Sequence, residues 1–319
     1  MESRDEDLRA IGIGNSHAKI ILIGEHSVVY GQPAIALPLP NVQLHVQLRR
    51  LDSANQHLIN SRYFKGPLDQ LPAKMAGVQK LTTALMDRFA GQHDSWEMTI
   101  DSQLPAERGM GSSAATAIGI VRAFFSLYEQ RLDRDLLLKL ADIEEQITHR
   151  SPSGLDAATC SAKQPVWFLK GQAGTTFRMN LTATMVVADT GKVGATKDAI
   201  LEVRSRLHHD HTATNRHIHH LGQLTKQAQS ILRLDRPAAL GQVLNQSQED
   251  LQALGVSDAA LDHLIEVARN HGALGAKLTG GGRGGCMFAI AANNTQARQL
   301  AQVLEQNGAK RTWLQPLNI

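Results

Sequence analysis

The strongest chemical signal in the sequence is a loop of glycines and serines that leads into a helix. An extended segment ends at Leu104-Pro105, and a segment with helical spacing follows at 114–128. The residues between and just inside the helix are Glu107, Arg108, Gly109, Met110, Gly111, Ser112, Ser113 and Ala114. Glycines let the backbone approach a ligand, and the first N–H groups of a helix attract an anion. The loop is therefore a candidate phosphate-binding site, and its serine hydroxyls could also reach a metal ion.

The same loop fits other patterns. A serine N-cap after a glycine turn is a more common origin of such a string. The string also matches the G-x-G-x-x-A dinucleotide fingerprint, but that fingerprint follows the first strand of a regular βαβ unit, and here antiparallel-looking strands precede it. No G-x-x-x-x-G-K-[ST] string occurs in the sequence. That absence excludes a standard P-loop.

A lysine lies inside the first predicted strand. Lys19 belongs to the apolar segment 18–24, and Glu25 and His26 follow at the strand end, where site residues often sit. Burying a lysine costs desolvation energy unless a carboxylate or a phosphate is nearby. The spacing fits equally well a lysine on the solvent face of an edge strand.

Two acidic residues are spaced to act together. Asp156 follows the turn Ser151-Pro152-Ser153-Gly154-Leu155, and Glu145 lies eleven residues earlier, near the end of a helix predicted at 133–149. An aspartate in a turn commonly stabilises that turn, whereas two carboxylates in one cleft could bind a metal ion and handle a proton. Glu145 points away from the apolar stripe, which fits a cleft and a solvent position equally. Glu144 is nearer the core edge and remains an alternative.

A second glycine-rich loop lies near the C-terminus. The segment 280–285 holds five glycines and Arg283, between the apolar segments 276–278 and 286–292. That density indicates close backbone approach or positive φ angles, beyond what a hairpin requires. Arg283 could bring a charge toward phosphate, although an arginine at a loop tip more often lies in water.

A histidine cluster at 208–220 suggests a metal site. Apart from Asp210, no cysteine or acidic residue completes a ligand set, and the stretch resembles the exposed edge of helices. A surface patch whose charge changes with pH is the favoured interpretation. The cluster consists of His208, His209, His211, His217, His219 and His220.

Hydrophobic spacing predicts the elements that position these residues. One face of the second strand should carry Val42, Leu44, Val46 and Leu48. The predicted strands are 18–24, 42–48, 96–100, 165–169 and 183–189, and the predicted helices are 75–89, 112–128, 133–149 and 294–306. Between residue 191 and the last helix, long helical segments are broken by Pro237, Gly255 and Gly272, and a strand closes the chain.

Length and element order together predict two domains of the α+β class. A chain of 319 residues exceeds what one hydrophobic core usually serves. Strands and helices mix without regular βαβ alternation, which favours α+β over a doubly wound parallel sheet. We place the domains at 1–182 and 183–319, the second richer in helices.

The composition is that of an ordinary globular protein. Hydrophobic residues make up 42% of the chain, the formal net charge is +3, and aromatic residues are only 4%. These values argue against a nucleic-acid partner. No apolar run approaches the ~20 residues that span a bilayer, and the N-terminus is acidic, unlike a secretory leader. Two distant cysteines, Cys160 and Cys286, suit a reducing compartment and are expected to be buried. We therefore expect a cytoplasmic protein with no membrane partner.

Four strings together resemble the GHMP kinase family, and within it the bacterial enzymes that phosphorylate mevalonate. They are KIILIGEHSVVYGQPAIALPL, ERGMGSSAA, PSGLDAATC and KLTGGGRGGCMFA, in the family's order across residues 19–289. Any one of them alone would be a weak signal, but four in order leave little room for chance. The resemblance implies transfer of a phosphoryl group from ATP, with Mg²⁺, to the 5-hydroxyl of (R)-mevalonate, a step of isoprenoid synthesis.

The resemblance also implies a fold and residue roles. An N-terminal α+β domain of ribosomal-S5-like topology would bind ATP, beside a helix-rich C-terminal GHMP domain. Asp156 matches the catalytic aspartate, and Lys19 matches the lysine that pairs with it. Glu145, rather than Glu144, matches the Mg²⁺ ligand, joined by one of the serines Ser112 and Ser113. The implied substrate-binding residues are Lys19, Glu25, His26, Asp156, Thr196, Gly281 and Gly282.

Two departures and several alternatives accompany the resemblance. Glu107 and Arg108 stand where many relatives have small residues, and Arg283 interrupts the glycine motif. A kinase or a decarboxylase acting on phosphorylated mevalonate, or a catalytically silent ligand sensor, would share the fold. The run 28–34 after Gly-Glu-His makes a galactokinase-like function less apt, and the pair Lys19 and Asp156 makes a homoserine-kinase-like function less apt. The sequence does not determine the oligomeric state, and a homodimer is one option.

Overall fold

The computed structural model describes residues 11–318, apart from 53–54 and 149–153. The chain forms two compact units, each assembled from separate stretches. The first unit contains 1–18, 43–104 and 113–161, and the second contains 19–42, 105–112 and 162–319. The domain boundary between 182 and 183 stays a prediction. The turn residues Ser151-Pro152-Ser153 lie outside the described residues.

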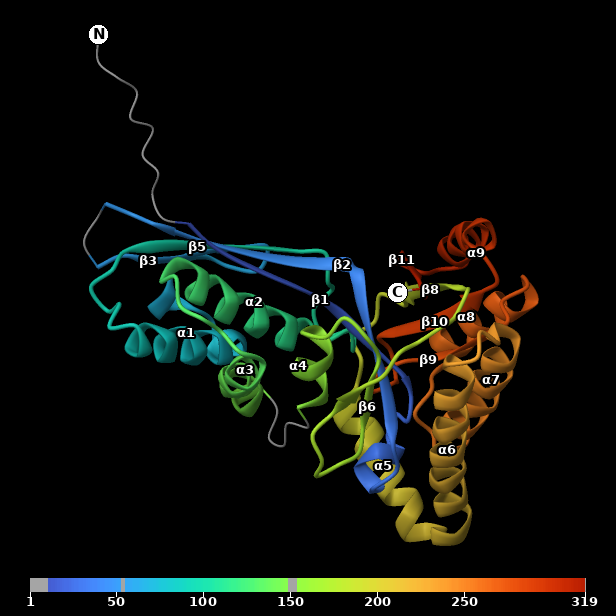
Figure 1. Ribbon diagram of the computed structural model, residues 1–319. Helices are drawn as coiled ribbons and strands as arrows, with labels where there is room; N and C mark the ends of the chain where they lie inside the picture. Colours follow the sequence, from blue (N-terminus) through green and yellow to red (C-terminus); the bar gives the residue numbers. More distant parts are fainter. Residues whose placement is uncertain (1–10, 53–54, 149–153, 319) are drawn as a thin grey trace. The chain divides into compact units, whose positions relative to one another are not determined.

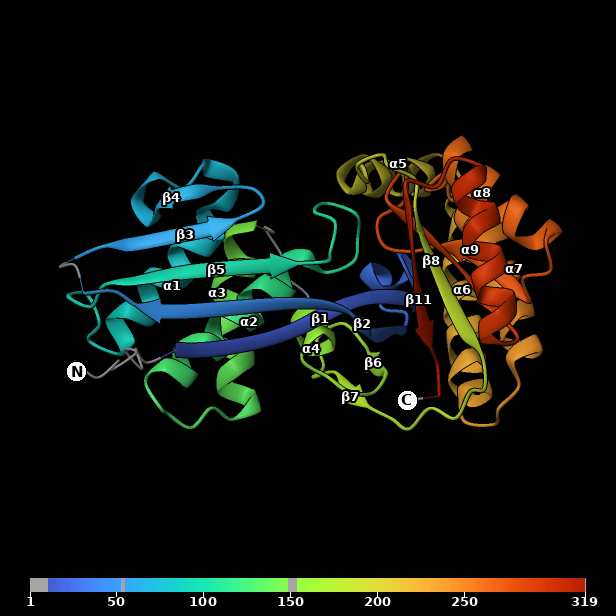
Figure 2. The same ribbon diagram turned by 90° about the horizontal axis from the view of Figure 1, so that it is seen from above.

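The first unit is a twisted sheet with helices on one face (Figure 1 and Figure 2). Its strands follow the order β4-β3-β5-β2, and β1 pairs with β2. The β2–β5 pair is antiparallel, whereas β3 and β5 run parallel. The strands are β1 (Ile11–Ile23), β2 (Ala34–Arg50), β3 (His57–Ser61), β4 (Lys65–Pro67) and β5 (Trp96–Ser102). The helices are α1 (Ala76–Arg88), α2 (Ser112–Leu127), α3 (Arg134–Thr148) and α4 (Leu155–Cys160).

Alternation along β2 produces the buried face that the sequence predicts. Val42, Leu44, Val46 and Leu48 are all buried, and the residues between them are exposed. Helix α2 packs on this face through Gly119, where an added Cβ would lie 2.8 Å from Val46 Cγ2. The glycine therefore allows the helix backbone to approach the sheet closely.

The second unit contains an antiparallel sheet of order β11-β8-β10-β9. Helices α8 and α9 pack against its strands, and α7 contacts both β9 and α6. The N-terminal part of β2 also belongs here, where Ala34 pairs with Phe168. The strands are β6 (Val166–Phe168), β7 (Thr175–Thr176), β8 (Thr184–Asp189), β9 (Gly275–Leu278), β10 (Cys286–Ala291) and β11 (Arg311–Pro316). The helices are α5 (Thr196–His209), α6 (His211–Leu232), α7 (Pro237–Ala253), α8 (Ala259–Asn270) and α9 (Asn294–Gln306).

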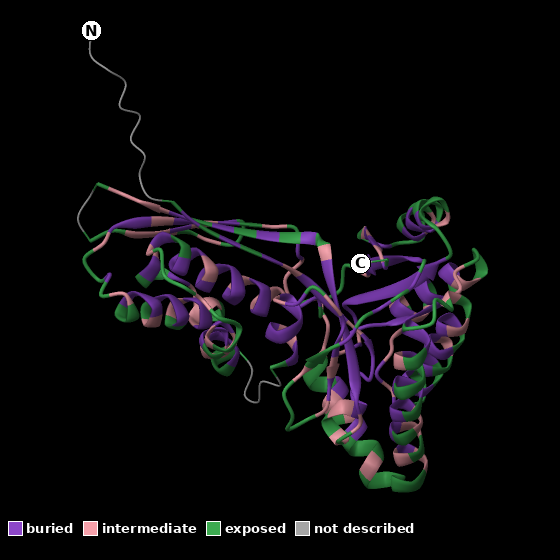
Figure 3. Cartoon of the chain, viewed as in Figure 1, coloured by how far each residue is buried: buried purple, intermediate pink, exposed green. Residues whose placement is uncertain are grey.

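Burial follows the predicted amphipathic pattern, and the α+β class is confirmed. Figure 3 shows buried residues on the sheets and on the helix faces turned toward them. The second unit's core is formed by side chains of β8–β10 and of α5–α9, including Val186, Met287 and Leu304. Cys160 and Cys286 are both buried, as expected. Among the described residues, no helix has the length and apolarity to cross a bilayer.

Candidate active site

The predicted phosphate loop adopts a backbone that only a few residue types accept. Glu107, Gly109 and Gly111 all have positive φ angles, and α2 begins at Ser112. A Cβ on Gly109 would lie 3.4 Å from Gly280 Cα, so this loop lies backbone to backbone against the C-terminal glycine loop. The N–H of Lys19 donates to Met110 O at 3.0 Å. The loop is thus shaped and anchored to expose its backbone, as an anion site requires.

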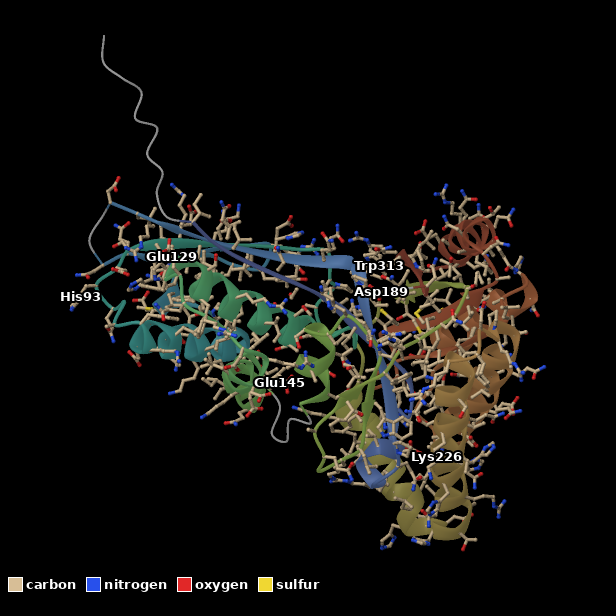
Figure 4. All side chains as sticks on the ribbon, in the orientation of Figure 1. His93, Glu129, Glu145, Asp189, Lys226 and Trp313 are labelled. Atoms are coloured by element: carbon tan, nitrogen blue, oxygen red, sulfur yellow. The ribbon has the colours of Figure 1, made fainter. Side chains whose placement is uncertain are left out.

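Arg108, one of the departures from the family pattern, forms an ion pair within the chain. Its Nε lies 3.0 Å from the Oδ1 of Asp189 at the end of β8, which Figure 4 labels. A second guanidinium nitrogen donates to Gly191 O at 3.0 Å. These contacts anchor the loop within the second unit. A contact from Arg108 to nucleotide stays a prediction.

The glycine loop joins β9 and β10 with four glycines at positive φ and with Arg283 at φ 51. The Arg283 side chain pairs with Glu202 of α5 at 3.0 Å and donates to Gly255 O at 3.0 Å. The guanidinium is thus partly buried against α5 and the Gly255 carbonyl, and its approach to phosphate stays a prediction. These contacts offset the backbone strain of a non-glycine residue in the left-handed region.

The last residues of β1 and the segment that follows it carry three buried polar groups in the second unit. Lys19 is 2% exposed, Glu25 1% and His26 7%. The burial of Lys19 excludes the interpretation that it lies on a solvent face. The Oε1 of Glu25 lies 2.5 Å from the ammonium of Lys277. Sequence reasoning missed Lys277, although a lysine within an apolar strand is the same signal that drew attention to Lys19.

The imidazole of His26 is held in one tautomer. Its Nε2 lies 2.9 Å from Gly281 O, and because a carbonyl only accepts, Nε2 carries the proton. The pKa of His26 is lowered to about 4, mainly by burial; the hydrogen bond to the Gly281 carbonyl opposes the shift, and the charge of Lys277 adds to it. His26 is therefore neutral near pH 7, and its Nδ1 can accept a hydrogen bond.

Gly281 also lies against Thr196, the first residue of α5. A Cβ built on Gly281 would come within 2.6 Å of Thr196 Cβ. A Cβ built on the neighbouring Gly282 would collide with the backbone oxygen of Val256. The structure therefore brings Thr196, Gly281, Gly282 and His26 together in the second unit. Space requires glycine at both 281 and 282, and the positive φ of Gly282 requires it by conformation as well.

The predicted carboxylates belong to the first unit. Glu145 on α3, labelled in Figure 4, is 3% exposed and accepts a hydrogen bond from the Ala157 N–H at 3.2 Å. Burial, and then the charge of Asp156, raises the pKa of Glu145 to about 7. Asp156 is half-buried in the first turn of α4, a short helix that the sequence analysis did not predict. A solvent-facing Glu145 is thus excluded.

Glu144 is equally buried but has different partners. Its Oε1 accepts hydrogen bonds from Ser113 Oγ at 2.5 Å and from Thr148 Oγ1 at 2.6 Å. The first of these bonds ties α2 to α3 within the first unit. Glu144 therefore serves a structural role in this conformation, whereas Glu145 has an electrostatic neighbour in Asp156. The assignment of the metal ligand to Glu145, Ser112 or Ser113 stays a prediction.

The histidine cluster lies on α5 and α6, where it is mostly exposed, as the sequence analysis predicts. His217 and His220 each place Nδ1 within 2.8 Å of a carboxyl oxygen of Asp250 on α7. Asp210 caps α6 by accepting from the Ala213 N–H. In the described part of the chain, no group of three or more histidine, cysteine or acidic residues is arranged to hold a metal ion.

Comparisons with known proteins agree with this arrangement. Residues 76–164 match the GHMP kinases N terminal domain, and residues 228–310 match the GHMP kinases C terminal domain. A mevalonate kinase of Pyrococcus abyssi is 30% identical over 88% of this chain and 88% of its own length. The mevalonate kinase structure from methicillin-resistant Staphylococcus aureus is 33% identical, with a TM-score of 0.77, and covers 98% of this chain and 100% of that one.

A more distant structure shares the fold. L. major mevalonate kinase in complex with R-mevalonate has a TM-score of 0.84 at 24% identity, with 98% of both chains covered. At that identity the match shows the fold alone. The family assignment therefore depends on the domain matches and on the relatives at 30% identity and above.

Proposed function

Because the chain belongs to the mevalonate kinases of the GHMP kinase family, we propose how its own residues carry out that family's reaction. The reaction moves the γ-phosphoryl group of ATP to a hydroxyl of mevalonate, and the acceptor we assign is the 5-hydroxyl of the (R) form. Phosphoryl transfer asks a protein mainly for positioning and for stabilisation of negative charge. Each residue assigned to the reaction either positions a reactant or stabilises negative charge.

The observation that carries the proposal is the backbone of the phosphate loop. Three residues with positive φ, Glu107, Gly109 and Gly111, precede the start of α2. Such a backbone turns its N–H groups toward an anion, and the helix dipole adds to the attraction. We assign the segment 107–114 to the phosphates of ATP, and the hydroxyls of Ser112 and Ser113 to phosphate or metal.

Mevalonate binding is assigned to the second unit. In the neutral ring of His26, Nε2 carries the proton and Nδ1 carries a lone pair. Nδ1 can therefore accept a hydrogen bond from a substrate hydroxyl. The Gly281 carbonyl holds the other ring nitrogen, Nε2, and Gly281 in turn lies against Thr196. We assign Thr196, Gly281 and Gly282 to the same substrate site. Glu25 supports the same turn, through a contact with Lys277. Substrate placement by several short contacts is the main source of rate acceleration in such transfers.

The chemical step is assigned to Asp156 and Lys19. Asp156 lies in the first turn of α4, half-buried, and would orient the substrate hydroxyl and accept its proton. The ammonium of Lys19 would stabilise the attacking oxygen as negative charge develops on it. A carboxylate and an ammonium group are what this chemistry requires, and we assign both residues to mevalonate binding as well.

The carboxylates fit a hard divalent cation. Glu145 is buried with its pKa raised by burial and by Asp156, which is the situation that a nearby cation relieves. Mg²⁺ favours one or two carboxylates together with substrate phosphates. When bound, Mg²⁺ offsets the negative charge of the phosphates. We assign Glu145 as its carboxylate ligand, with Ser112 or Ser113 as a hydroxyl ligand.

A coupled assay of ADP release tests the function directly. The purified protein is supplied with ATP and Mg²⁺ and with mevalonate, phosphomevalonate, homoserine or galactose in turn. We expect turnover with (R)-mevalonate and background rates with the other three compounds. Turnover only with phosphomevalonate would assign the chain to the next kinase or to a decarboxylase, and binding of mevalonate without turnover would make it a silent sensor.

A further inference from the structure

The second unit contains a fully buried ion pair that the proposed chemistry does not use. Lys277 of β9 is 0% exposed, and its Nζ lies 2.5 Å from Oε1 of Glu25, which is 1% exposed. The same ammonium donates to Leu278 O at 2.6 Å and lies 5.4 Å from the ring centre of Phe288. A buried ion pair is seldom more stabilising than apolar residues of the same volume. Stability alone therefore does not account for it.

The pair is also incompletely satisfied. The second carboxyl oxygen of Glu25, Oε2, is buried and accepts no hydrogen bond from any residue that the structure describes. A pair arranged only for stability would saturate both oxygens. The pair lies beside a strained turn at His26, and holding that turn in place is an alternative explanation for the ion pair.

His26 is the central residue of that turn. Its φ and ψ are 58° and −46°, and the Ser27 N–H donates to Glu25 O at 2.6 Å across it. These values describe a γ-turn with positive central φ, which is rare and strained for a residue other than glycine. Such strain persists only where surrounding contacts hold it, and it often occurs at functional sites.

Contacts on both sides of His26 hold the turn. On one side, Lys277 fixes the side chain of Glu25. On the other, the Ser27 hydroxyl donates to Gly24 O at 3.2 Å. The imidazole itself bonds to Gly281 O. Removing one of these contacts would let the strained backbone relax and would let the imidazole of His26 change its position.

Three contacts join the end of β9 and the start of the glycine loop to the segment 21–26. Lys277 contacts Glu25, Thr279 exchanges two hydrogen bonds with the backbone of Ile21, and Gly281 accepts from His26. The first lies within β9, and the other two follow its end at Leu278. The ion pair is the charged member of a row that fixes the turn onto β9 and the glycine loop.

We propose that Lys277 is a positioning residue of the kinase reaction, which through Glu25 holds the His26 turn in the geometry that binds mevalonate. Lys277 has no contact with a reacting group in this scheme. The inference depends on the proposed role of His26 in substrate binding. It predicts a loss directed at mevalonate rather than at ATP.

The test compares Lys277→Met with the double variant Glu25→Gln/Lys277→Met in the full-length protein. The single variant leaves a buried carboxylate unpaired, so it loses both stability and the anchor. The double variant removes both charges at nearly constant volume, so its stability should recover while the anchor stays absent. We expect kcat/KM for mevalonate to fall ~10- to ~10²-fold in both variants, the scale of a misplaced binding group, with KM for ATP changed less than about twofold.

Leu304→Ala is the matched control for a general loss of stability. Leu304 is buried in the core of the same unit and is remote in sequence from the turn. Thermal unfolding monitored by circular dichroism ranks the variants, and each assay is run well below the lowest midpoint. We expect Leu304→Ala to lower the midpoint without a selective change in the constants for mevalonate. Should Lys277→Met fail to fold, the double variant alone decides.

Three results would overturn the inference. They are wild-type kcat/KM for mevalonate in the double variant, unchanged kinetics in Lys277→Met, and equal losses toward mevalonate and ATP. His26→Gln separates this inference from the proposed function. If His26→Gln leaves kcat/KM for mevalonate unchanged, the role of His26 is wrong. If it lowers that constant while the double variant does not, only the role of Lys277 is wrong.

Discussion

Glu145 of α3 accepts a hydrogen bond from the N–H of Ala157, the residue that follows Asp156, at a distance of 3.2 Å. The bond places a buried carboxylate in the electrostatic field of Asp156, and burial together with that field raises the pKa of Glu145 to about 7. A group with this pKa must lose its proton before it can bind a cation. The metal requirement of the enzyme should therefore depend on pH.

Glu145→Gln should raise the Mg²⁺ concentration needed for half-maximal activity and remove its dependence on pH. In the wild-type protein that concentration should increase as the pH falls below about 7, because protons compete with Mg²⁺ for Glu145. Titration of turnover with Mg²⁺ at several pH values measures both effects. Glu144→Gln is the matched control. A larger change in Glu144→Gln than in Glu145→Gln would move the ligand role to Glu144.

Asp156→Asn should lower kcat at least ~10²-fold, the usual scale of a lost acid–base group. An amide can still orient a hydroxyl, but it cannot accept its proton. KM for ATP should remain nearly unchanged, because the phosphate loop is untouched. Steady-state kinetics measures both constants, and Asp135→Asn, at an exposed position of α3, provides a charge-matched control. Near-normal turnover of Asp156→Asn would refute the assignment.

The stability of the protein should respond to pH through His26 and Glu145 with opposite signs. The folded-state pKa of His26 lies near 4, below its ordinary value of 6.5, so stability is lost as the pH falls from about 6.5 toward 4. The folded-state pKa of Glu145 lies near 7, above its ordinary value of 4.5, so stability is lost as the pH rises from about 4.5 toward 7.

Denaturant unfolding of wild type, His26→Gln and Glu145→Gln at several pH values isolates these two effects. The difference in unfolding free energy between wild type and each variant should change with pH, at up to about 1.4 kcal/mol per unit. The unfolding free energy of wild type minus that of His26→Gln should decrease as the pH falls from about 6.5 toward 4. The corresponding difference for Glu145→Gln should decrease as the pH rises from about 4.5 toward 7. Parallel pH curves for all three proteins would contradict both pKa directions.

Arg108→Ala and Asp189→Asn should raise KM for ATP by similar factors of about tenfold or less, the scale of one positioning contact. The two side chains pair at 3.0 Å and anchor the phosphate loop, so the double variant should be little worse than either single one. Kinetics of the three variants measures the coupling. A large effect of Arg108→Ala with none from Asp189→Asn would indicate instead that Arg108 contacts the nucleotide.

Local pattern was enough to predict the long elements of the fold. The helix predicted at 294–306 has those bounds in the structure, and the strand face of Val42 to Leu48 is buried. Both depend on spacing within one segment. The helix α4 has only six residues, too few for a hydrophobic period to appear. The sequence therefore predicts a turn at these residues and not a helix.

Partners distant in sequence limited the prediction of the site. The burial of Lys19 and of Glu145 could not be decided by spacing, because each depends on what covers the element. Lys277 pairs with a residue 252 positions away, and Arg283 pairs with Glu202 on another element. A sequence shows that such charges interrupt apolar or glycine-rich runs, but only the fold provides their partners.

The division of β1 and β2 between the two units has a consequence for synthesis on the ribosome. Residues 19–42 belong to the second unit, whose other strands and helices occur mostly after residue 162. The apolar residues 34–39, almost all fully buried in the finished protein, must therefore wait for most of the polypeptide to be translated before their partners exist. Non-local pairing of this kind slows folding and leaves apolar segments exposed meanwhile. No single cut in the gene would yield either unit as an uninterrupted chain.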